Sequence, residues 1–297
     1  MANPRLCDKV VIGENPVREK DAAMEDMPMS SLEAEGPIPT AARPGEPKVK
    51  TITVDDISEA LAAGMRDFRA APLFGLLFGV ACAAVGLLLV TLAGDFGLMY
   101  LAYPVIAGFA LVAPAAAVGF YVISRRLERG QPVAIGSVVA TIIAEGGKEL
   151  GFMALVGLFG LLTWLYSAGF LYALFFGLHP ADVGDIVANA VATPRGLAFL
   201  FVGNIVGGIM ALILFSVSVV SFPLLIDREV DFVTAMITSI RVVAASPGPM
   251  IGWGIFIATL TGVAILPMFL GLIFVLPLLG HATWHLYRRA VVPADVA

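Results

Sequence analysis

Long apolar runs separated by short polar segments dominate the sequence from residue 52 to residue 292. A transmembrane helix needs about 20 mainly apolar residues, and the runs predict spans at about 72–93, 98–123, 151–176 and 197–226. The last run, 250–284, contains 35 residues without Lys, Arg, Asp or Glu. Because that is too long for one helix, we expect two spans with a hinge near Leu266-Pro267. The predicted fold class is all-α, a polytopic membrane bundle of six transmembrane helices arranged as three hairpins.

Three segments, 53–71, 135–149 and 231–245, precede the first, third and fifth spans and are not apolar enough to cross a membrane. In the first of them the apolar residues recur at helical spacing, at Ile57, Leu61, Met65 and Phe68. Thr53 and Asp56 are spaced as a capping box that would begin this helix. Each segment therefore predicts an amphipathic helix lying in the membrane interface, although two consecutive glycines weaken the middle one.

The same segments indicate an internal repeat. Arg follows Ala by six residues, and Pro follows Arg by six, in two places: Ala60, Arg66, Pro72 and Ala235, Arg241, Pro247. We therefore divide a membrane domain of residues 52–292 into three units, 53–130, 132–229 and 230–290, each an interfacial helix followed by a transmembrane hairpin.

The cationic residues fix the expected orientation. Eleven Lys and Arg residues follow Ile52, and ten of them fall at every second boundary of the apolar runs, Arg195 being the exception. Since cationic loops stay in the cytoplasm, we expect both termini and all three interfacial helices at the cytoplasmic face of a bacterial inner membrane. Anionic lipid head groups are the expected partners of this basic face.

The ends of the chain differ from the membrane domain. Residues 1–51 contain seven prolines and sixteen charges, which predicts a disordered cytoplasmic tail, and 293–297 form a short C-terminal tail. Cys7 and Cys82 lie where they are not expected to meet, so a disulfide is not predicted. The hydrophobic share of 59% and the charged share of 14% exclude a water-soluble domain. A basic patch interleaved with aromatic residues is lacking, so nucleic acid is not an expected partner.

Three strings give the chain a family resemblance: GFYVISRRLERG (119–130), SFPLLIDREVDFVTAMITSIRVVAASP (221–247) and GHATWHLYRRAV (280–291). They resemble a family of proteobacterial six-span integral membrane proteins, domain of unknown function 2189, over about residues 52–292, with departures at Phe120, Val122 and Ser246. The resemblance implies an inner-membrane protein without an assigned activity. Members are sometimes labelled as cytochrome c oxidase subunit I, but a haem-copper centre needs His ligands from several helices and this chain has three His.

Two histidines are the candidate ligands. His281 and His285 stand four residues apart, so both rings project from one face of the last span and could hold a metal or haem iron together. The alternative is that they form hydrogen bonds between helices, beside an interfacial belt made by Trp284 and Tyr287. We favour the alternative, because no other residues evidently complete a ligand set, and we predict neither a metal nor a cofactor.

Two further polar features are candidates for structural roles. A cluster at the predicted cytoplasmic face is expected to hold the repeats together through ion pairs; its members are Asp227, Arg228, Glu229, Arg241, Arg125, Arg126 and Arg288. Asn204 is the main strongly polar residue deep within a span, and it stands among glycines that permit close helix packing.

Function is less constrained than architecture. Catalytic motifs such as a nucleophile elbow, a phosphate-binding loop or HExxH are lacking, so an enzyme is not predicted. Two hypotheses remain. The first is an accessory, assembly or scaffold component of a larger membrane complex or homo-oligomer, which lipid-facing glycine surfaces would favour. The second is a transporter, channel or lipid-handling protein for a neutral or apolar solute, which a polar-lined cavity reaching Asn204 would favour.

Overall fold

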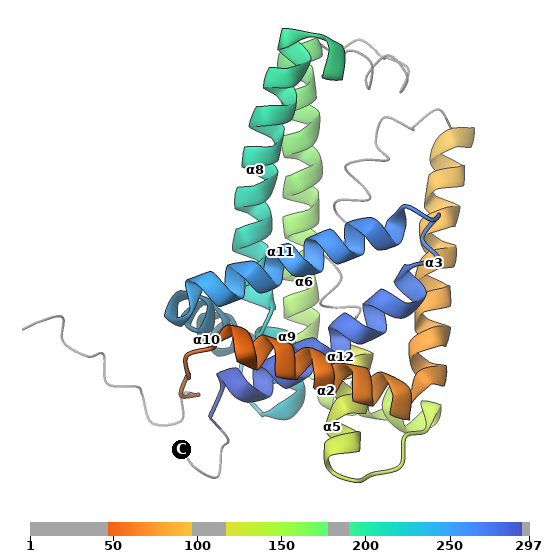
Figure 1. Cartoon of the computed structure of the whole chain (residues 1–297), viewed down its shortest axis with the longest axis vertical. Helices are drawn as coiled ribbons and strands as arrows, with labels where there is room; N and C mark the ends of the chain where they lie inside the picture. Colours follow the sequence, from red (N-terminus) through yellow and green to blue (C-terminus); the bar gives the residue numbers. More distant parts are fainter. Residues whose placement is uncertain (1–46, 97–116, 178–189, 293–297) are drawn as a thin grey trace, which may run out of the picture. The chain divides into compact units, whose positions relative to one another are not determined.

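A computed structural model describes residues 47–96, 117–177 and 190–292. They belong to a unit that comprises residues Glu46–Ala297. Its helices are labelled in Figure 1 and are α2 (Val54–Ala70), α3 (Pro72–Asp95), α5 (Val118–Glu128), α6 (Ile135–Phe176), α8 (Pro194–Ser218), α9 (Ser221–Asp227), α10 (Phe232–Ala245), α11 (Pro247–Ile265) and α12 (Leu272–Ala290). Most of the predicted tail, of the second span and of the loop before Arg195 lies outside the described residues.

Four helices in the described part are long and apolar enough to cross a membrane: Pro72–Leu92, Gly147–Phe176, Pro194–Asp227 and Pro247–Ile265. They correspond to the first, third, fourth and fifth predicted spans, so the chain is an all-helical membrane protein. The described end of the second span is α5. The sixth, α12, is not among the four, because the two His and two Arg residues of its second half lower its mean hydropathy. Most of that half is also buried against other helices.

The first amphipathic helix begins where its sequence predicts. The Thr53 hydroxyl accepts a hydrogen bond from the Asp56 amide, and an Asp56 carboxylate oxygen accepts one from the Thr53 amide, so the capping box is present. A single residue, Ala71, then separates α2 from Pro72 at the start of α3. Ser246 joins α10 to Pro247 in the same way, and the two linking residues have nearly equal dihedral angles, φ −133° and ψ 54° against φ −142° and ψ 61°.

The middle interfacial segment joins its span without a gap, because α6 runs from Ile135 to Phe176. Gly147 interrupts it with φ 38° and ψ −155°, a left-handed backbone conformation that glycine adopts without a Cβ penalty. The glycine pair that weakens the helical pattern thus marks the bend between the amphipathic and apolar parts.

The break in the long apolar run lies at 266–271, at the predicted Leu266-Pro267 hinge, between α11 and α12. Met268 and Phe269 take positive φ values of 54° and 68° there. After this turn α12 lies along both α2 and α3. A Cβ on Gly64 would come within 2.6 Å of the Ala282 nitrogen, so this close approach depends on glycine.

Each amphipathic helix packs against the end of another predicted unit. The helix of the first unit, α2, lies on α12 of the third; the start of α6 in the second unit lies on α5 of the first; and α10 of the third lies on α8 and α9 of the second. Such a cyclic order is what three repeated units would produce, although the repeat itself stays a prediction.

The last residues of the predicted tail, 47–51, are described by the structure, and they contact the end of α12. The Lys50 amide donates to the Ala290 carbonyl, and the Val292 amide donates to the Lys48 carbonyl, so Val49 and Val291 form an isolated antiparallel bridge. Extended backbone on both sides satisfies these groups, a pairing that composition alone does not reveal.

Candidate functional site

A network of polar side chains joins α2, α5, α9 and α12. Helix α12 positions it, because His281, His285 and Arg288 follow one another at helical spacing and project from one face. We call the interacting set the polar network; its members are Asp67, Ser124, Glu128, Asp227, His281, His285, Tyr287 and Arg288.

The inner half of the network has the shortest distances. The Ser124 hydroxyl donates to Asp67 Oδ2 at 2.7 Å, and His285 Nε2 lies 2.7 Å from the same oxygen. Ser124 Oγ also lies 2.8 Å from His281 Nδ1. Because the single hydroxyl proton is directed to Asp67, we assign the proton between Ser124 and His281 to Nδ1 of the imidazole.

This assignment leaves the other ring nitrogen of His281 without a partner. His281 is 0% exposed, and its Nε2 makes no hydrogen bond among the described residues. The ring packs edge-on against Phe120, with centroids 5.3 Å apart. An imidazole with one nitrogen fixed by hydrogen bonds and the other bare is the form in which histidine binds a metal.

A complete metal site does not surround it. In the part of the chain that the structure describes, no group of three or more His, Cys, Asp and Glu residues could hold a metal ion. His285, the other candidate, directs its nitrogens to carboxylates: Nε2 to Asp67, and Nδ1 to Glu128 at 3.5 Å. Both rings therefore bond to neighbouring helices.

Asp67 stays ionised within this setting. Burial on its own raises the pKa of a carboxyl group, but hydrogen bonds from His285 and Ser124 outweigh it and lower the pKa of Asp67 below its ordinary 3.8. The carboxylate thus accepts two hydrogen bonds on one oxygen.

The outer half of the network consists of ion pairs. Arg288 Nε lies 3.4 Å from Glu128, and its terminal nitrogen lies 3.1 Å from Asp227. The Tyr287 hydroxyl donates to Asp227 at 2.7 Å, and Arg129 lies 3.7 Å from the same carboxylate. Asp227, at the end of α9, is therefore the point where three cationic or hydroxyl groups from α12 and the end of α5 meet.

The predicted cytoplasmic cluster is brought together only in part. Of its seven members, Asp227 and Arg288 join the network. Arg125 donates to the Ile226 carbonyl, and Arg228 donates to the Val292 carbonyl. Arg126 donates to oxygens at the start of α6, those of Pro132, Ser137 and Thr141. Glu229 and Arg241 are exposed.

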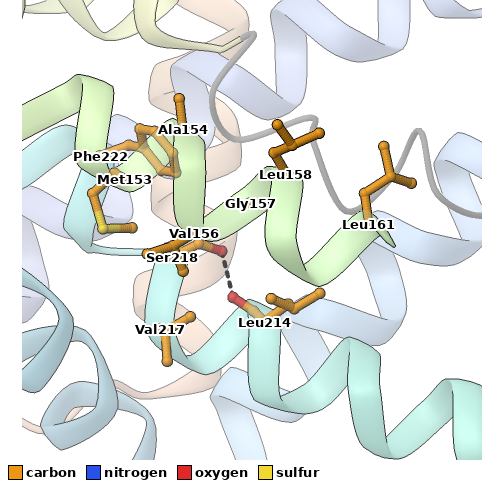
Figure 2. A pocket seen from close by; sticks show the side chains of 10 residues that line it. All are labelled: Met153, Ala154, Val156, Gly157, Leu158, Leu161, Leu214, Val217, Ser218 and Phe222. Atoms are coloured by element: carbon orange, nitrogen blue, oxygen red, sulfur yellow. Dashed lines mark hydrogen bonds between the residues drawn. The ribbon is translucent and has the colours of Figure 1, made fainter. Parts of the chain in front are cut away.

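Asn204 is also exposed, on α8, and donates to the Leu200 carbonyl of its own helix. A Cβ added to nearby Gly203 or Gly208 would meet no atom of the described residues within 4 Å. A small apolar cavity of about 140 Å³ lies between α6 and α8, on the part of the helices shown in Figure 2. Its Ser218 hydroxyl already donates to the Leu214 carbonyl, so it presents no free donor to a ligand.

Sequence reasoning missed Asp67, Ser124 and Glu128. A signal for Asp67 exists in α2, since Ala60, Ala63 and Gly64 are its buried residues and Asp67 follows them on the same helical face. A stripe of small residues indicates where another helix approaches closely. An acidic residue at the end of such a stripe indicates a partner on that helix.

One comparison with known proteins gives a match. Residues 102–227 match a family model described as "Predicted integral membrane protein (DUF2189)". The family predicted from the sequence is confirmed. Of the three strings that carried the resemblance, the match contains 119–130, whereas 280–291 lies beyond it. Searches of the curated proteins and of the solved structures found no match.

Proposed function

We propose that this integral membrane protein is an accessory or scaffold component, which docks other membrane helices onto its lipid-facing helices. One observation carries the proposal. Gly248 and Gly252 stand four residues apart on α11, both are exposed, and neither has an atom of the described chain within 4 Å of an added Cβ. Paired small residues at this spacing let two transmembrane helices approach closely.

Helix α8 offers a second surface of this kind. Asn204 and Gly208 are four residues apart, and both are exposed. A partner helix passing over Gly208 would bring its own polar atoms within reach of Asn204. The partner is a larger membrane assembly or a second copy of this chain.

The alternative, a transporter or channel, would need a polar-lined cavity reaching Asn204, and the grooves found among the described residues do not provide one. The larger groove found among the described residues is mainly apolar, and Asn204 does not line it. Asn204 also uses its amide group within its own helix. These observations favour docking over a polar path for a solute.

The polar network is suited to hold the helices in position for such docking. It ties the ends of α5, α9 and α12 to α2, and the exposed Arg66 and Arg69 of α2 lie beside it in sequence. We place this face at the cytoplasmic side of a bacterial inner membrane, where the arginines contact anionic lipid head groups.

Site-specific photocrosslinking in intact membranes tests the proposal. A photoreactive residue in place of Thr259, which is exposed two helical turns after Gly252, is expected to form protein adducts that Gly252→Leu abolishes, because leucine would block close helix approach. Gly254→Leu is the matched control, since Gly254 lines the groove instead. Adducts to lipid alone at Thr259 would contradict the scaffold function.

A further inference from the structure

A groove among α5, α8, α11 and α12 has the properties of a ligand site. Its volume is about 440 Å³, and its walls are mostly apolar. On the α8 and α11 sides small residues leave the space open, namely Gly208, Ala211, Gly254 and Ala258. Ligand sites in proteins are typically about 300–1,000 Å³ in volume, apolar, and supplied with a few polar groups.

Two residues that are buried over most of their surface line this groove with their hydroxyl groups. Tyr121 is 2% exposed and Thr261 is 4% exposed, and neither hydroxyl has a hydrogen-bond partner among the described residues. Ser218 and Thr283, which also line the groove, instead donate to carbonyls of their own helices. Tyr121 and Thr261 are thus free to bond to a ligand.

One end of the groove has Tyr121 and Thr283, whereas Thr261 lies near the other end, close to the turn at 266–271. Tyr121 precedes Ser124 by one helical turn, and Thr283 precedes Tyr287 by one turn, so their end leads toward the polar network. Leu276 and Gly208 lie away from it along their helices. A ligand that is apolar over most of its length, with a hydrogen-bond acceptor at one end, matches this distribution.

We propose that the groove binds one acyl chain of a membrane phospholipid, whose ester carbonyl accepts a hydrogen bond from the Tyr121 hydroxyl. Two of the four helices are long and apolar enough to cross the membrane, so the molecules surrounding them are lipids. Phospholipid supplies both the apolar chain and the acceptor. The proposal does not depend on docking at Gly248 and Gly252 of α11, which do not line the groove, although Gly208 of the α8 surface does.

The test compares two glycines on the same helix. A Cβ at Gly254 would lie 3.5 Å from the Phe215 ring, an ordinary contact, while a leucine there would extend into the groove. Gly252 has open space around it and does not line the groove. Full-length protein is reconstituted in phosphatidylcholine vesicles containing a phospholipid with a photoreactive acyl chain, and the labelled peptides are identified by mass spectrometry.

We expect labels on α8 and α11 residues that line the groove. Gly254→Leu should lower this labelling by about tenfold, and Gly252→Leu should leave it unchanged. Tyr121→Phe, which keeps the ring and removes the hydroxyl, should lower it several-fold and so tests the site even if Gly254→Leu fails to fold. Equal labelling of wild type, Gly254→Leu and Tyr121→Phe would overturn the proposal. So would labels confined to residues outside the groove.

Discussion

At the scale of single residues, Asp67 is the acceptor on which the inner half of the polar network depends. One of its oxygens forms hydrogen bonds with both Ser124 and His285. Through Ser124 it also orients His281. The protein places this carboxylate on a short helix outside the spans and directs it at α5 and α12. A single charge thereby connects three helices.

Replacing Asp67 by Asn should lower the free energy of unfolding by about 1–3 kcal/mol, because a neutral amide oxygen is a weaker acceptor than a carboxylate for the hydrogen bonds with Ser124 and His285. Thermal melting in mild detergent measures the change. The control is Asp55→Asn, an exposed residue of the same helix, which should melt as wild type does. An unchanged melting temperature for Asp67→Asn would show that the network does not stabilise the fold.

The stability that Asp67 contributes to the fold depends on pH in a defined direction. The folded protein lowers the pKa of Asp67 below 3.8, so the carboxylate adds stability that is present above about pH 4 and is lost as the pH falls through the folded pKa. The difference in melting temperature between wild type and Asp67→Asn should therefore shrink on acidification. A difference that grows toward low pH would contradict this assignment.

His281 and His285 are expected to bind no metal, since the described residues around them do not complete a ligand set and two imidazoles leave a divalent ion short of its usual four ligands. Elemental analysis and a visible absorption spectrum of protein purified without chelators or a His tag measure this. Stoichiometric metal or haem that disappears in a His281→Ala, His285→Ala double variant would instead make the bare Nε2 of His281 a ligand.

At the scale of elements, sequence patterns predicted local features of the helices better than contacts between residues far apart in the chain. The capping box of α2, the bend at Gly147 and the break after Ile265 all follow from residues close together in the chain. The pairing of Asp67 with His285 spans 218 positions, and no local pattern encodes it. The extended segment at Val49 was missed for the same reason.

Among the predicted spans that the structure describes, the sixth, α12, has the least support as a membrane-crossing helix. Its apolar length suggests a membrane helix, yet His281, Trp284 and Tyr287 are buried against other helices. Sequence hydropathy does not distinguish a helix that faces lipid from one enclosed by protein. Gly79 of α3 contacts α12 directly. A small residue at this position indicates close packing against protein, which hydropathy does not.

Gly79→Ala should destabilise the α3–α12 contact by about 1–3 kcal/mol, because the added methyl would overlap the Ile273 backbone and the helices must separate. Gly169→Ala, on an open face of α6 with no atom within 4 Å of the new methyl, should be neutral or slightly stabilising, since alanine favours helix. Thermal melting in the same detergent compares the two. Equal effects would show that α3 and α12 do not approach closely.

At the scale of the whole molecule, the polar network and the predicted topology agree. The segments expected in the cytoplasm on cationic bias alone are the amphipathic helix before Pro72, the loop at 124–130, the turn at 227–229 and the end of α12. Contacts among Asp67, Glu128, Asp227 and Arg288 bring these four segments together. Segments that share a network must lie on the same side of a membrane.

The last prediction follows from that constraint. Reporter fusions after Gly130 and at the C-terminus should give the same cytoplasmic signal, because Glu128 and Arg288 are 3.4 Å apart and cationic segments resist translocation. A fusion at Asp185, which lies outside the described residues, should report the opposite side. If α11 crossed the membrane and α12 did not return, the C-terminus would report opposite to Gly130, and the six-span arrangement would be wrong. Matching signals from Gly130 and the C-terminus, with an opposite one from Asp185, are the result expected if α11 and α12 form the final hairpin.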